Sequence, residues 1–591
     1  MFKISSNIPS LLQQEEESGQ ITDECSDSTQ KGKLEIETVV ETESSDDDDN
    51  KGLGTKKAEA ATLIWSEKTL YYTYAWIWVC FFMLNFHSTI VGNVIYYAYN
   101  DFNSAPQVLT ANILATVVGG VMNIPIANLI TIWGRAEGLC VFLVIYMVGV
   151  IVGGSCHGPV GYATSYCLFW VGLNGIFVIL DVFVADTSGL KNRALSFAFS
   201  TSPIICTAFT GPLCATAYLK GPGWRWAYHS SFIMAPFIYG PVIILLKIFE
   251  RKAIKKGILK TNQINRTFIQ SCWFYFKQFD VIGCFLLMAA FILILLPFSL
   301  QSFGEAEYKS AKFIAMLIVG VLLCPIFYIW ERYYATRPMI KWSLLKNRTV
   351  MGACIVALSV NFSVCAWNSY FYSFTIVVYD ISTTYAGYMQ QIFTVGYTFW
   401  SIIFAAWIRI TKTFKYTCLF FGFPLIALGT GLFYHFSINQ DNIGLMIMCQ
   451  IFIAFGGGTL ILGYQMAVMA SATLDSIPIL LVLTNLFASI GMAFGQATST
   501  GVYTNVFLKS LIKNLPTDSV DLAGDLYLGG YTAQIMYPIG DPIRSACTLA
   551  WGDYQKNAAI AAICILMLIL PSISIWKNYN VDKKQNKGTV L

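Results

Sequence analysis

The sequence predicts an all-α membrane protein that crosses the bilayer many times, and three observations lead to this fold class. Of the 591 residues, 55% are hydrophobic, 15% are aromatic and only 12% are charged, whereas soluble domains carry roughly 25% charged residues. The mean hydropathy is +0.57, which is more apolar surface than a soluble core can bury. The apolar residues gather in runs long enough to cross a bilayer, since a helix needs ~20 apolar residues to span ~30 Å of hydrocarbon.

The first 65 residues differ from the rest of the chain. Stretches such as "EEESGQITDECSDSTQ" and "ETESSDDDDNKG" are acidic, rich in Ser and Thr, and nearly free of aromatic residues. Such a segment cannot bury enough apolar surface to offset its ordering entropy, so we expect residues 1–65 to be a disordered cytosolic tail. Because no basic stretch precedes a short apolar run, we expect no cleaved signal peptide. Residues that trafficking or ubiquitin machinery could use are Lys31, Lys33, Ser44, Ser45, Lys56 and Lys57, although a solvated spacer is the alternative.

From about residue 70 the chain becomes a series of apolar runs, each long enough for one transmembrane helix. We expect fourteen such helices, near 70–92, 108–130, 138–155, 164–184, 195–218, 228–248, 281–300, 312–331, 349–369, 385–407, 417–435, 442–464, 478–507 and 558–577. They divide into an N-terminal six-helix bundle (66–250), a cytosolic linker with two extra helices (251–348) and a C-terminal six-helix bundle (349–577). This last bundle includes a long outer loop, 508–557, and a cytosolic tail, 578–591, follows it.

The lysines and arginines predict the orientation in the membrane. The loops on one side of the predicted membrane carry eighteen of them, and the loops on the other side carry eight. Since basic residues are retained in the cytosol, we expect both termini to be cytosolic. The sequons at Asn265 and Asn347 then face the cytosol and remain unglycosylated. The plasma membrane is the expected location, with the endosomal or vacuolar membrane as the alternative.

Six plus six helices joined by a long basic linker is the layout of a major facilitator, in which two bundles rock about a central cavity. The hairpin at 281–331 corresponds to the extra pair of helices in fourteen-helix members. Nothing in the sequence resembles a channel filter, a Walker loop, a metal-ligand cluster or a nucleophile elbow, and only four histidines are present. We therefore expect a transporter rather than an enzyme, without a cofactor, a metal site or a nucleic-acid partner. Its expected partners are a small molecule, protons and the lipid bilayer.

A charged elbow, "DVFVADTSGLKNRALSF" (181–197), lies between the fourth and fifth predicted helices. Arg135, which follows the second predicted helix, lies on the same side of the membrane. Asp186 could cap the elbow or pair with Arg135, Lys191 or Arg193, and breaking such pairs would accompany opening toward the cytosol. These four residues are therefore candidates for a latch. The alternative is a juxtamembrane anchor that only follows the positive-inside rule.

Five motifs resemble the fungal siderophore–iron transporter family of the major facilitator superfamily. "FVADTSGLKNRAL" resembles the family's "ADTSSLRNRAL" string, and "GPGWRWAYHSSF" (221–232) resembles its "WRWGYGMF" segment. The chain resembles three further segments of the family at "FDVIGCFLLMAAFILILLPFSL" (279–300), "AKFIAMLIVGVLLCPIFYIWERYYATRPMI" (311–340) and "MYPIGDPIR" (536–544). The resemblance covers roughly 70–580 in the family's order. The chain departs from the family at Thr131, which stands where the family has an aspartate, so one charge of the usual latch is missing.

The resemblance implies proton-driven import of ferric siderophores such as hydroxamate chelates. Some members of the family instead handle haem or exchange glutathione, and both remain open. Drug export is a further alternative, because "TGPLC" (210–214) contains the Gly-Pro pair that exporters have in this helix. The acidic tail and the lost aspartate also leave open a nutrient receptor that does not transport.

Polar and aromatic side chains within the predicted helices are candidates for a substrate cavity. A bulky, nearly neutral chelate requires a wide cavity with aromatic walls and a few hydrogen-bonding groups. Polar residues in mid-membrane are unfavourable unless they face water or a neighbouring helix, although packing against lipid is the alternative for each aromatic. The candidates are Asn85, Asn361, Trp367, Asn368, Tyr372, Gln390, Gln391, Tyr397 and Gln450.

Proton symport requires a titratable group within the membrane, and two residues qualify. Asp181 is the clearest carboxylate inside a predicted span and lies ~7 Å deeper along the helix than Asp186. His87 is the second candidate, because imidazole titrates near physiological pH. A structural hydrogen bond to a neighbouring helix is the alternative role for both.

The predicted outer loop, 508–557, is too long for a simple connection between two helices. Loops of this length often form lids or first docking surfaces. The candidate docking residues are Tyr527, Tyr531, Tyr537, Asp541 and Arg544. Phenol rings stack on flat ligands and phenolates bind ferric iron, so haem is a competing substrate. The alternative is a short ordered cap.

Overall fold

The computed structural model describes residues 57, 60, 65–102, 108–257, 268–278, 280–301, 309–335, 346–437, 442–472 and 476–581. Regular structure within these residues is helical throughout, and none of them forms a strand. Most of the expected tail over 1–65, the sequon at Asn265 and the residues after 581 lie outside the described part.

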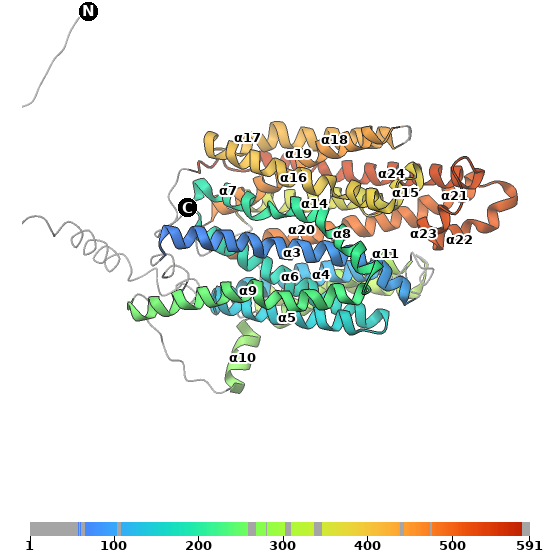
Figure 1. Cartoon of the computed structure of the whole chain (residues 1–591). Helices are drawn as coiled ribbons and strands as arrows, with labels where there is room; N and C mark the ends of the chain where they lie inside the picture. Colours follow the sequence, from blue (N-terminus) through green and yellow to red (C-terminus); the bar gives the residue numbers. More distant parts are fainter. Residues whose placement is uncertain are drawn as a thin grey trace, which may run out of the picture. The chain divides into compact units, whose positions relative to one another are not determined.

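The first half of the chain folds into a run of apolar helices (Figure 1). They are α3 (Glu67–Asp101), α4 (Val108–Ile132), α5 (Arg135–Ser155), α6 (Pro159–Thr187), α7 (Leu190–Thr201), α8 (Pro203–Lys220) and α9 (Trp224–Lys255). Gly134 separates α4 from α5 with a φ of 121°, a backbone conformation that glycine adopts without strain. Pro203 begins α8 directly after α7, so these two helices form one candidate span, Leu190–Lys220.

Three helices connect the two halves of the chain. They are α10 (Phe268–Gln278), α11 (Val281–Gln301) and α12 (Ala311–Ile329), which continues as η2 (Trp330–Tyr334). α11 and α12 pack against each other as the expected hairpin, and α11 also packs against α4 and α20.

The second half repeats the serial arrangement and includes several short helices between α20 and α24. Its helices are α14 (Arg348–Asn368), α15 (Phe371–Tyr379), α16 (Thr383–Thr411), α17 (Lys415–Thr417), η3 (Cys418–Gly422), α18 (Phe423–Phe436), α19 (Ile443–Ser471), α20 (Ile477–Val502), η5 (Tyr503–Phe507), α21 (Leu508–Asn514), η6 (Thr517–Leu522), α22 (Ala523–Leu528), α23 (Gly530–Gln534), α24 (Pro542–Leu566) and α25 (Ile569–Ser574).

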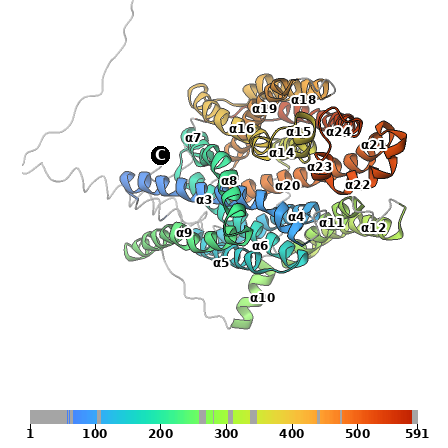
Figure 2. The same ribbon diagram turned by 45° about the vertical axis from the view of Figure 1, so that its right-hand side comes forward.

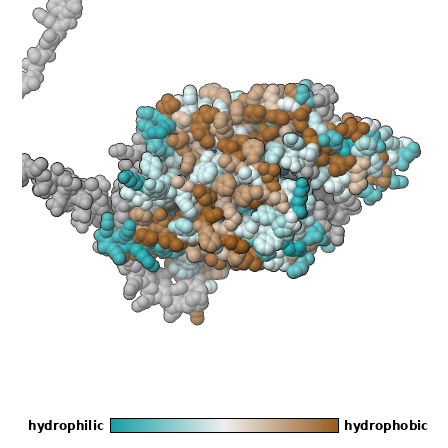
Figure 3. All heavy atoms as spheres, in the orientation of Figure 1, coloured by the Kyte–Doolittle hydropathy of each residue, from teal (hydrophilic) through white to brown (hydrophobic). Residues whose placement is uncertain are grey.

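Thirteen helices in the described part of the chain are long and apolar enough to cross a membrane, and Val281–Pro297 within α11 is a shorter apolar helix. The all-α, multi-pass fold class is thereby confirmed, and α11 is the member of the expected fourteen with the shorter apolar segment. Hydrophobic residues cover much of the visible face of the helical body, and hydrophilic residues gather toward its ends (Figure 3). This distribution fits a body surrounded by lipid.

The last span begins earlier than the sequence predicts. Hydropathy places it near 558–577 with a loop over 508–557, whereas the structure begins α24 at Pro542 and makes Pro542–Ser574 the candidate span. Asp541 caps this helix by accepting a hydrogen bond from the amide of Ile543 at 2.8 Å. Polar residues such as Gln555 lower the hydropathy of this segment, but they are buried inside the protein rather than exposed to lipid.

The two halves meet along several helix pairs. α4 packs against α20, and α16 packs against both α7 and α8. We name the end of the bundle that carries α7, with Arg135 and Asp186, the elbow end. The opposite end, which carries α21 to α23, is the loop end (Figures 1 and 2).

Candidate functional site

A cavity of about 440 Å³ lies between the two halves and is called the chamber here. Its walls come from α3, α6 and α8 of the first half and from α14, α15 and α16 of the second, with Tyr531 of α23 at the loop end. Its polar and aromatic lining consists of Asn85, Ser88, Thr89, Asn93, Tyr97, Trp170, Thr207, Thr216, Asn368, Tyr372, Thr384, Gln390, Gln391, Thr394, Tyr397 and Tyr531. None of the described lining residues carries a charge. The chamber therefore offers neutral hydrogen-bonding groups between aromatic rings.

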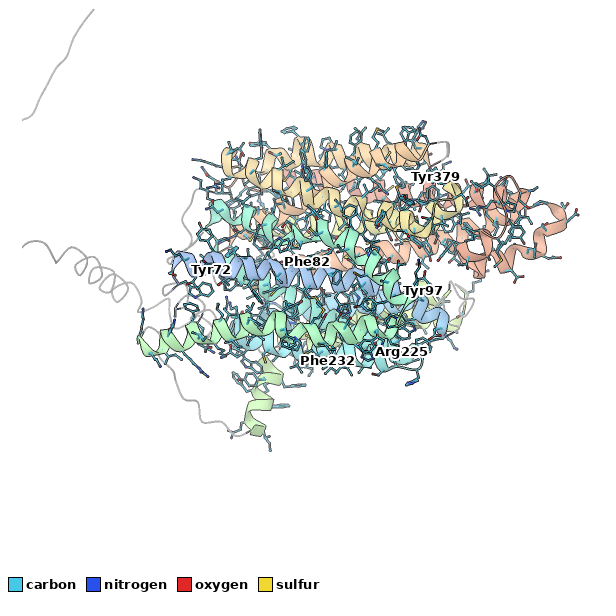
Figure 4. The ribbon with its side chains drawn as sticks, viewed as in Figure 1. Tyr72, Phe82, Tyr97, Arg225, Phe232 and Tyr379 are labelled. Carbon is cyan, nitrogen blue, oxygen red and sulfur yellow. The ribbon has the colours of Figure 1, made fainter. Side chains whose placement is uncertain are left out.

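The α3 wall presents one polar face to the chamber. Asn85, Thr89 and Asn93 recur every four residues, which is the spacing that places side chains on the same side of a helix. The amide nitrogens of Asn85 and Asn93 donate to carbonyl oxygens one turn back, at 2.8 and 2.7 Å. Their amide oxygens are therefore the groups that remain to accept hydrogen bonds. Tyr97 lies farther along α3 toward the loop end, and Tyr72 lies toward its other end (Figure 4).

The opposite wall of the chamber contains a buried oxygen that no described residue pairs with. Asn368 ends α14, and its Oδ1 is buried without a hydrogen-bond partner in the described part of the chain. Gln390, Gln391 and Tyr397 line the chamber from α16. A buried acceptor without a donor is unfavourable, so a ligand that donates a hydrogen bond here would recover that free energy.

Tyr531 forms part of the chamber wall at the loop end. Its ring meets that of Tyr372 edge to face at a centroid distance of 5.8 Å. Burial raises the pKa of the Tyr531 phenol, and the neighbouring Tyr97 adds to the rise against the opposing effect of the hydrogen bond with Tyr372. The phenol therefore keeps its proton at neutral pH, which favours stacking and hydrogen bonding over binding of ferric iron by a phenolate.

The other predicted docking residues form contacts within the protein at the loop end. Tyr527 stacks on Tyr503 at 5.2 Å, and Asp541 caps α24. Arg544 is buried, pairs with Asp380 at 3.2 Å and donates to four backbone carbonyls, one of which belongs to Tyr537 at 3.2 Å. Of the five residues, only Tyr531 lines the chamber.

Three residues predicted for the cavity lie elsewhere. Asn361 donates to the carbonyl of Ala357 at 2.8 Å. Trp367 and Gln450 are fully buried inside the second half, and both side-chain polar atoms of Gln450 lack a hydrogen-bond partner in the described part of the chain. The prediction missed Ser88, Thr89 and Asn93, although their helical spacing beside Asn85 is visible in the sequence.

Asp181, the first candidate for proton coupling, is buried in α6 with 6% of its surface exposed. Its Oδ1 lacks a hydrogen-bond partner in the described part of the chain. Trp170, on the same helix, lines the chamber. Eleven residues of helix separate the two, so Asp181 lies ~16 Å nearer the elbow end.

His87, the second candidate, lies inside the first half and not in the chamber wall. Its Nδ1 forms a hydrogen bond with the Tyr146 hydroxyl. The rings of Phe169 and Tyr228 surround it at centroid distances of 5.1 and 6.2 Å. The imidazole is fully buried, and Nε2 has no partner among the described residues.

The four latch candidates meet at the elbow end. Arg135 binds Asp186 through Nη2 at 2.9 Å and through Nε at 3.0 Å. Arg193 is buried and donates to the carbonyl of Ser188 at 3.2 Å. Lys191 lies exposed on the first turn of α7. The Arg135–Asp186 pair joins α5 to α6, so it lies within the first half rather than between the halves.

The elbow end contains a second ion-pair network, which the sequence does not predict. Glu137 binds both Lys247 of α9 and Lys57, the latter at 2.7 Å, and Lys57 also binds Glu250 at 2.7 Å. Thr131, which stands where the family has an aspartate, donates instead to a carbonyl of its own helix at 2.8 Å.

The segment before α3 is packed at two points, contrary to the expectation of a disordered tail up to residue 65. Lys57 joins the ion-pair network just described, and Trp65 packs between Phe249 and Phe183 at centroid distances of 4.7 and 5.4 Å. Composition alone could not reveal this, because the partners lie on α5, α6 and α9, far away in the sequence.

Comparisons with known proteins agree with this architecture. The Major Facilitator Superfamily matches residues 77–496. Siderochrome iron transporter 2 of Aspergillus fumigatus is 52% identical over 539 residues, which are 91% of this chain and 89% of the relative. MFS siderochrome iron transporter 1 of Ajellomyces capsulatus is 37% identical over 592 residues, 100% of this chain and 99% of the relative. Siderophore iron transporter mirB of Emericella nidulans is 33% identical, covering 91% of this chain and 89% of the relative.

Solved structures of low sequence identity share the fold. An inward-facing, occupied bacterial homologue of the human lysosomal transporter Spinster gives a TM-score of 0.51 at 12% identity, covering 87% of this chain and 98% of that one. A variant of the peptide transporter POT gives 0.52 at 14% identity, covering 88% and 99%. The chain belongs to the Major Facilitator Superfamily and, within it, to the family of fungal siderophore–iron transporters.

Proposed function

We propose that this protein imports ferric siderophores of the tris-hydroxamate type through the chamber between its two halves. The observation that carries the proposal is the chamber's uncharged lining of amides, hydroxyls and aromatic rings. Three hydroxamates neutralise Fe³⁺, so such a chelate needs hydrogen bonds rather than an ion-pair partner. A catecholate chelate is anionic and would enter this low-dielectric site without a cation to balance it. The relatives named as siderophore or siderochrome iron transporters support the same substrate class.

Asp181 is proposed as the group that couples uptake to protons. A buried carboxyl with an unpartnered oxygen is unfavourable as an anion and favourable as a neutral acid. Asp181 is buried in this structure, and opening toward the cytosol would hydrate it and release its proton. His87 supports this role less well, because its Nδ1 is engaged by Tyr146 and it is not among the residues that line the chamber.

The proposed orientation places the elbow end in the cytosol and the loop end outside. The excess of Lys and Arg in the loops at the elbow end supports it. In the plasma membrane, the chamber described here would then receive substrate from outside. An epitope inserted in the loop between α22 and α23 should be stained on intact cells, whereas an epitope at either terminus should require permeabilisation.

Uptake of radioactive iron into iron-starved cells that lack their own importers tests the function. We expect accumulation from a tris-hydroxamate chelate, little from a catecholate chelate or from haem, and loss of accumulation when the proton gradient is collapsed. Asp181→Asn should reach the surface, bind the chelate and accumulate little iron.

Each alternative predicts a different result in the same assay. Accumulation from haem would identify a haem transporter, and efflux of preloaded glutathione conjugate or drug would identify an exchanger or exporter. Binding without accumulation in the unaltered protein would identify a receptor. Unchanged gradient-dependent uptake by Asp181→Asn would remove this carboxyl from the coupling mechanism.

A further inference from the structure

Helix α10 differs from the spanning helices in length and direction. Its 11 residues extend ~16 Å, which is too short to cross ~30 Å of hydrocarbon. It lies in the chain between the spanning helix α9 and the apolar helix α11. In two views, α10 runs across the direction of α5 and α9 rather than along it (Figures 1 and 2). A helix in this position runs along a membrane surface.

One face of α10 is apolar and exposed. Ile269, Trp273 and Phe276 are 78%, 59% and 38% exposed. At 3.6 residues per turn, these three side chains lie within about 60° of one another around the helix. The rings of Trp273 and Phe276 stack nearly parallel at a centroid distance of 5.7 Å. The result is a continuous apolar edge rather than scattered surface residues.

A different side of α10 attaches the helix to the protein. Tyr275 meets Trp133 edge to face at 5.2 Å, and it lies about 130° around the helix from the centre of the apolar edge. Trp133 forms the turn between α4 and α5, directly before Gly134 and Arg135. This contact holds α10 at the level of the elbow end and leaves the apolar edge turned away from its attachment.

In the sequence, basic residues flank α10 and no acidic residue lies among them. From residue 251 to residue 279 the sequence contains no Asp or Glu, and its basic residues are Arg251, Lys252, Lys255, Lys256, Lys260, Arg266 and Lys277. The four on the end of α9 are exposed. The Nζ of Lys277 lies 5.2 Å from the ring centroid of Trp273, so a cation borders the apolar edge directly.

We infer that α10 is a membrane-surface anchor that binds anionic lipid. Ile269, Trp273 and Phe276 insert among the acyl chains. The exposed basic residues Arg251, Lys252, Lys255, Lys256 and Lys277 bind the head groups of a lipid such as phosphatidylserine. An exposed apolar face bordered by lysines, with Trp among the apolar residues, is the pattern of helices that lie in the interface. Helix α9, which precedes α10 in the chain, is a candidate membrane span with exposed Phe237 and Ile244, so the anchor would continue a lipid-facing surface.

Photo-crosslinking of the full-length protein in nanodiscs tests the anchor. Phe276 is replaced by p-benzoylphenylalanine, and Phe274, which lies about 130° from the centre of the apolar edge, receives the same replacement as the matched control. In discs of phosphatidylcholine with phosphatidylserine, we expect roughly tenfold more lipid adduct from position 276 than from position 274. Equal adduct at the two positions would overturn the anchor. In whole-cell membranes, a cross-link from position 276 to a protein would show that the apolar edge binds a protein rather than lipid.

Lipid composition tests the choice of an anionic head group. Adduct at position 276 should rise about threefold when phosphatidylserine is added to phosphatidylcholine. The combined substitution Lys252→Gln, Lys255→Gln and Lys256→Gln should remove this rise and leave the adduct in pure phosphatidylcholine unchanged. A yield that does not depend on phosphatidylserine would refute the electrostatic part of the inference. Because nanodiscs present the same lipids on both faces, the result does not depend on the proposed orientation or substrate.

Discussion

The elbow end and the loop end hold their polar side chains in different ways. At the elbow end two described ion pairs match their charges: the mostly buried Arg135 binds Asp186 at 2.9 Å, and the partly exposed Glu137 binds Lys57 at 2.7 Å. In the chamber, toward the loop end, the described lining is uncharged, and the Oδ1 of Asn368 has no partner.

This difference follows from the cost of burying each kind of group. An unmatched buried charge is far more costly than an unmatched neutral amide, so charges occur where the protein itself supplies the partner. Neutral amides can remain unpaired at moderate cost, which keeps them available to a ligand. The comparison therefore separates side chains that stabilise the protein from side chains that we propose to bind substrate.

The largest expected effect comes from Arg544, a buried cation at the loop end. Besides its ion pair with Asp380, Arg544 donates to the carbonyl oxygens of Ile376, Val377, Gln534 and Tyr537. Arg544→Ala leaves these groups buried and unpaired, so we expect the free energy of unfolding to fall by about 3–5 kcal/mol. Arg544→Lys should recover little, because an ammonium cannot reproduce the guanidinium fork. Thermal unfolding of the purified protein measures both.

A matched control is available in the same region of the molecule. Arg225 pairs with Asp101 at 3.7 Å, but both side chains are about half exposed. Solvent screens such a pair, so Arg225→Ala should change the free energy of unfolding by less than about 0.5 kcal/mol. Comparable losses in Arg544→Ala and Arg225→Ala would show that burial does not control the strength of these contacts.

The Arg135–Asp186 pair should have the next largest effect. Both side chains are mostly buried, with 5% and 13% exposed. Arg135→Ala and Asp186→Asn should each lower the free energy of unfolding by about 2–3 kcal/mol, because each leaves a buried partner unmatched. The double variant should lose no more than the worse single variant, since the two residues act as a unit. Additive losses in chemical unfolding would contradict a direct pair.

Asn368 should affect substrate binding and not stability. Its buried oxygen has no partner to lose, so Asn368→Leu should leave the melting temperature unchanged or raise it slightly. The KM for a ferric tris-hydroxamate should rise about tenfold, since one hydrogen bond to the chelate is removed.

Gln555 is the control for Asn368, because its buried amide lies outside the chamber lining and its nitrogen donates to the carbonyl of Trp367 at 3.0 Å, although its oxygen, like that of Asn368, has no partner in the described part of the chain. Gln555→Leu should lower the free energy of unfolding by about 1–2 kcal/mol and leave KM unchanged. If the two variants behave alike, the unpaired oxygen of Asn368 is not reserved for substrate.

The smallest expected effect concerns Tyr531 and pH. Because burial raises the pKa of its phenol, the packed side chain retains its proton, and this contribution to stability is fully present below the ordinary pKa of about 10. It is lost only as pH rises through the folded-state pKa. Chelate binding should therefore show the same pH profile from about 6 to 9 in the unaltered protein and in Tyr531→Phe, with affinities within about threefold. Affinity for haem that rises with pH only when Tyr531 is present would instead identify a phenolate ligand.

Sequence reasoning located the chamber in part. Asn85, Asn368 and Gln390 were named from their polarity inside apolar runs, and all three line the chamber. The same signal also selected Trp367 and Gln450, which are buried within the second half. Polarity within a span predicts that a side chain avoids lipid, but it does not distinguish a chamber wall from a helix–helix contact.

The sequence by itself determined that the chain is a multi-pass, all-α membrane protein. The length of each apolar run and the positions of the charged residues are local properties, and they decide which segments cross a bilayer. The tertiary structure alone decided which polar atoms are left without partners, as in Asn368 and Asp181, and which charges are matched, as in the network of Lys57 and Glu137. These pairings join residues that are distant in the chain, and whether a buried group is paired depends on the helices that pack around it.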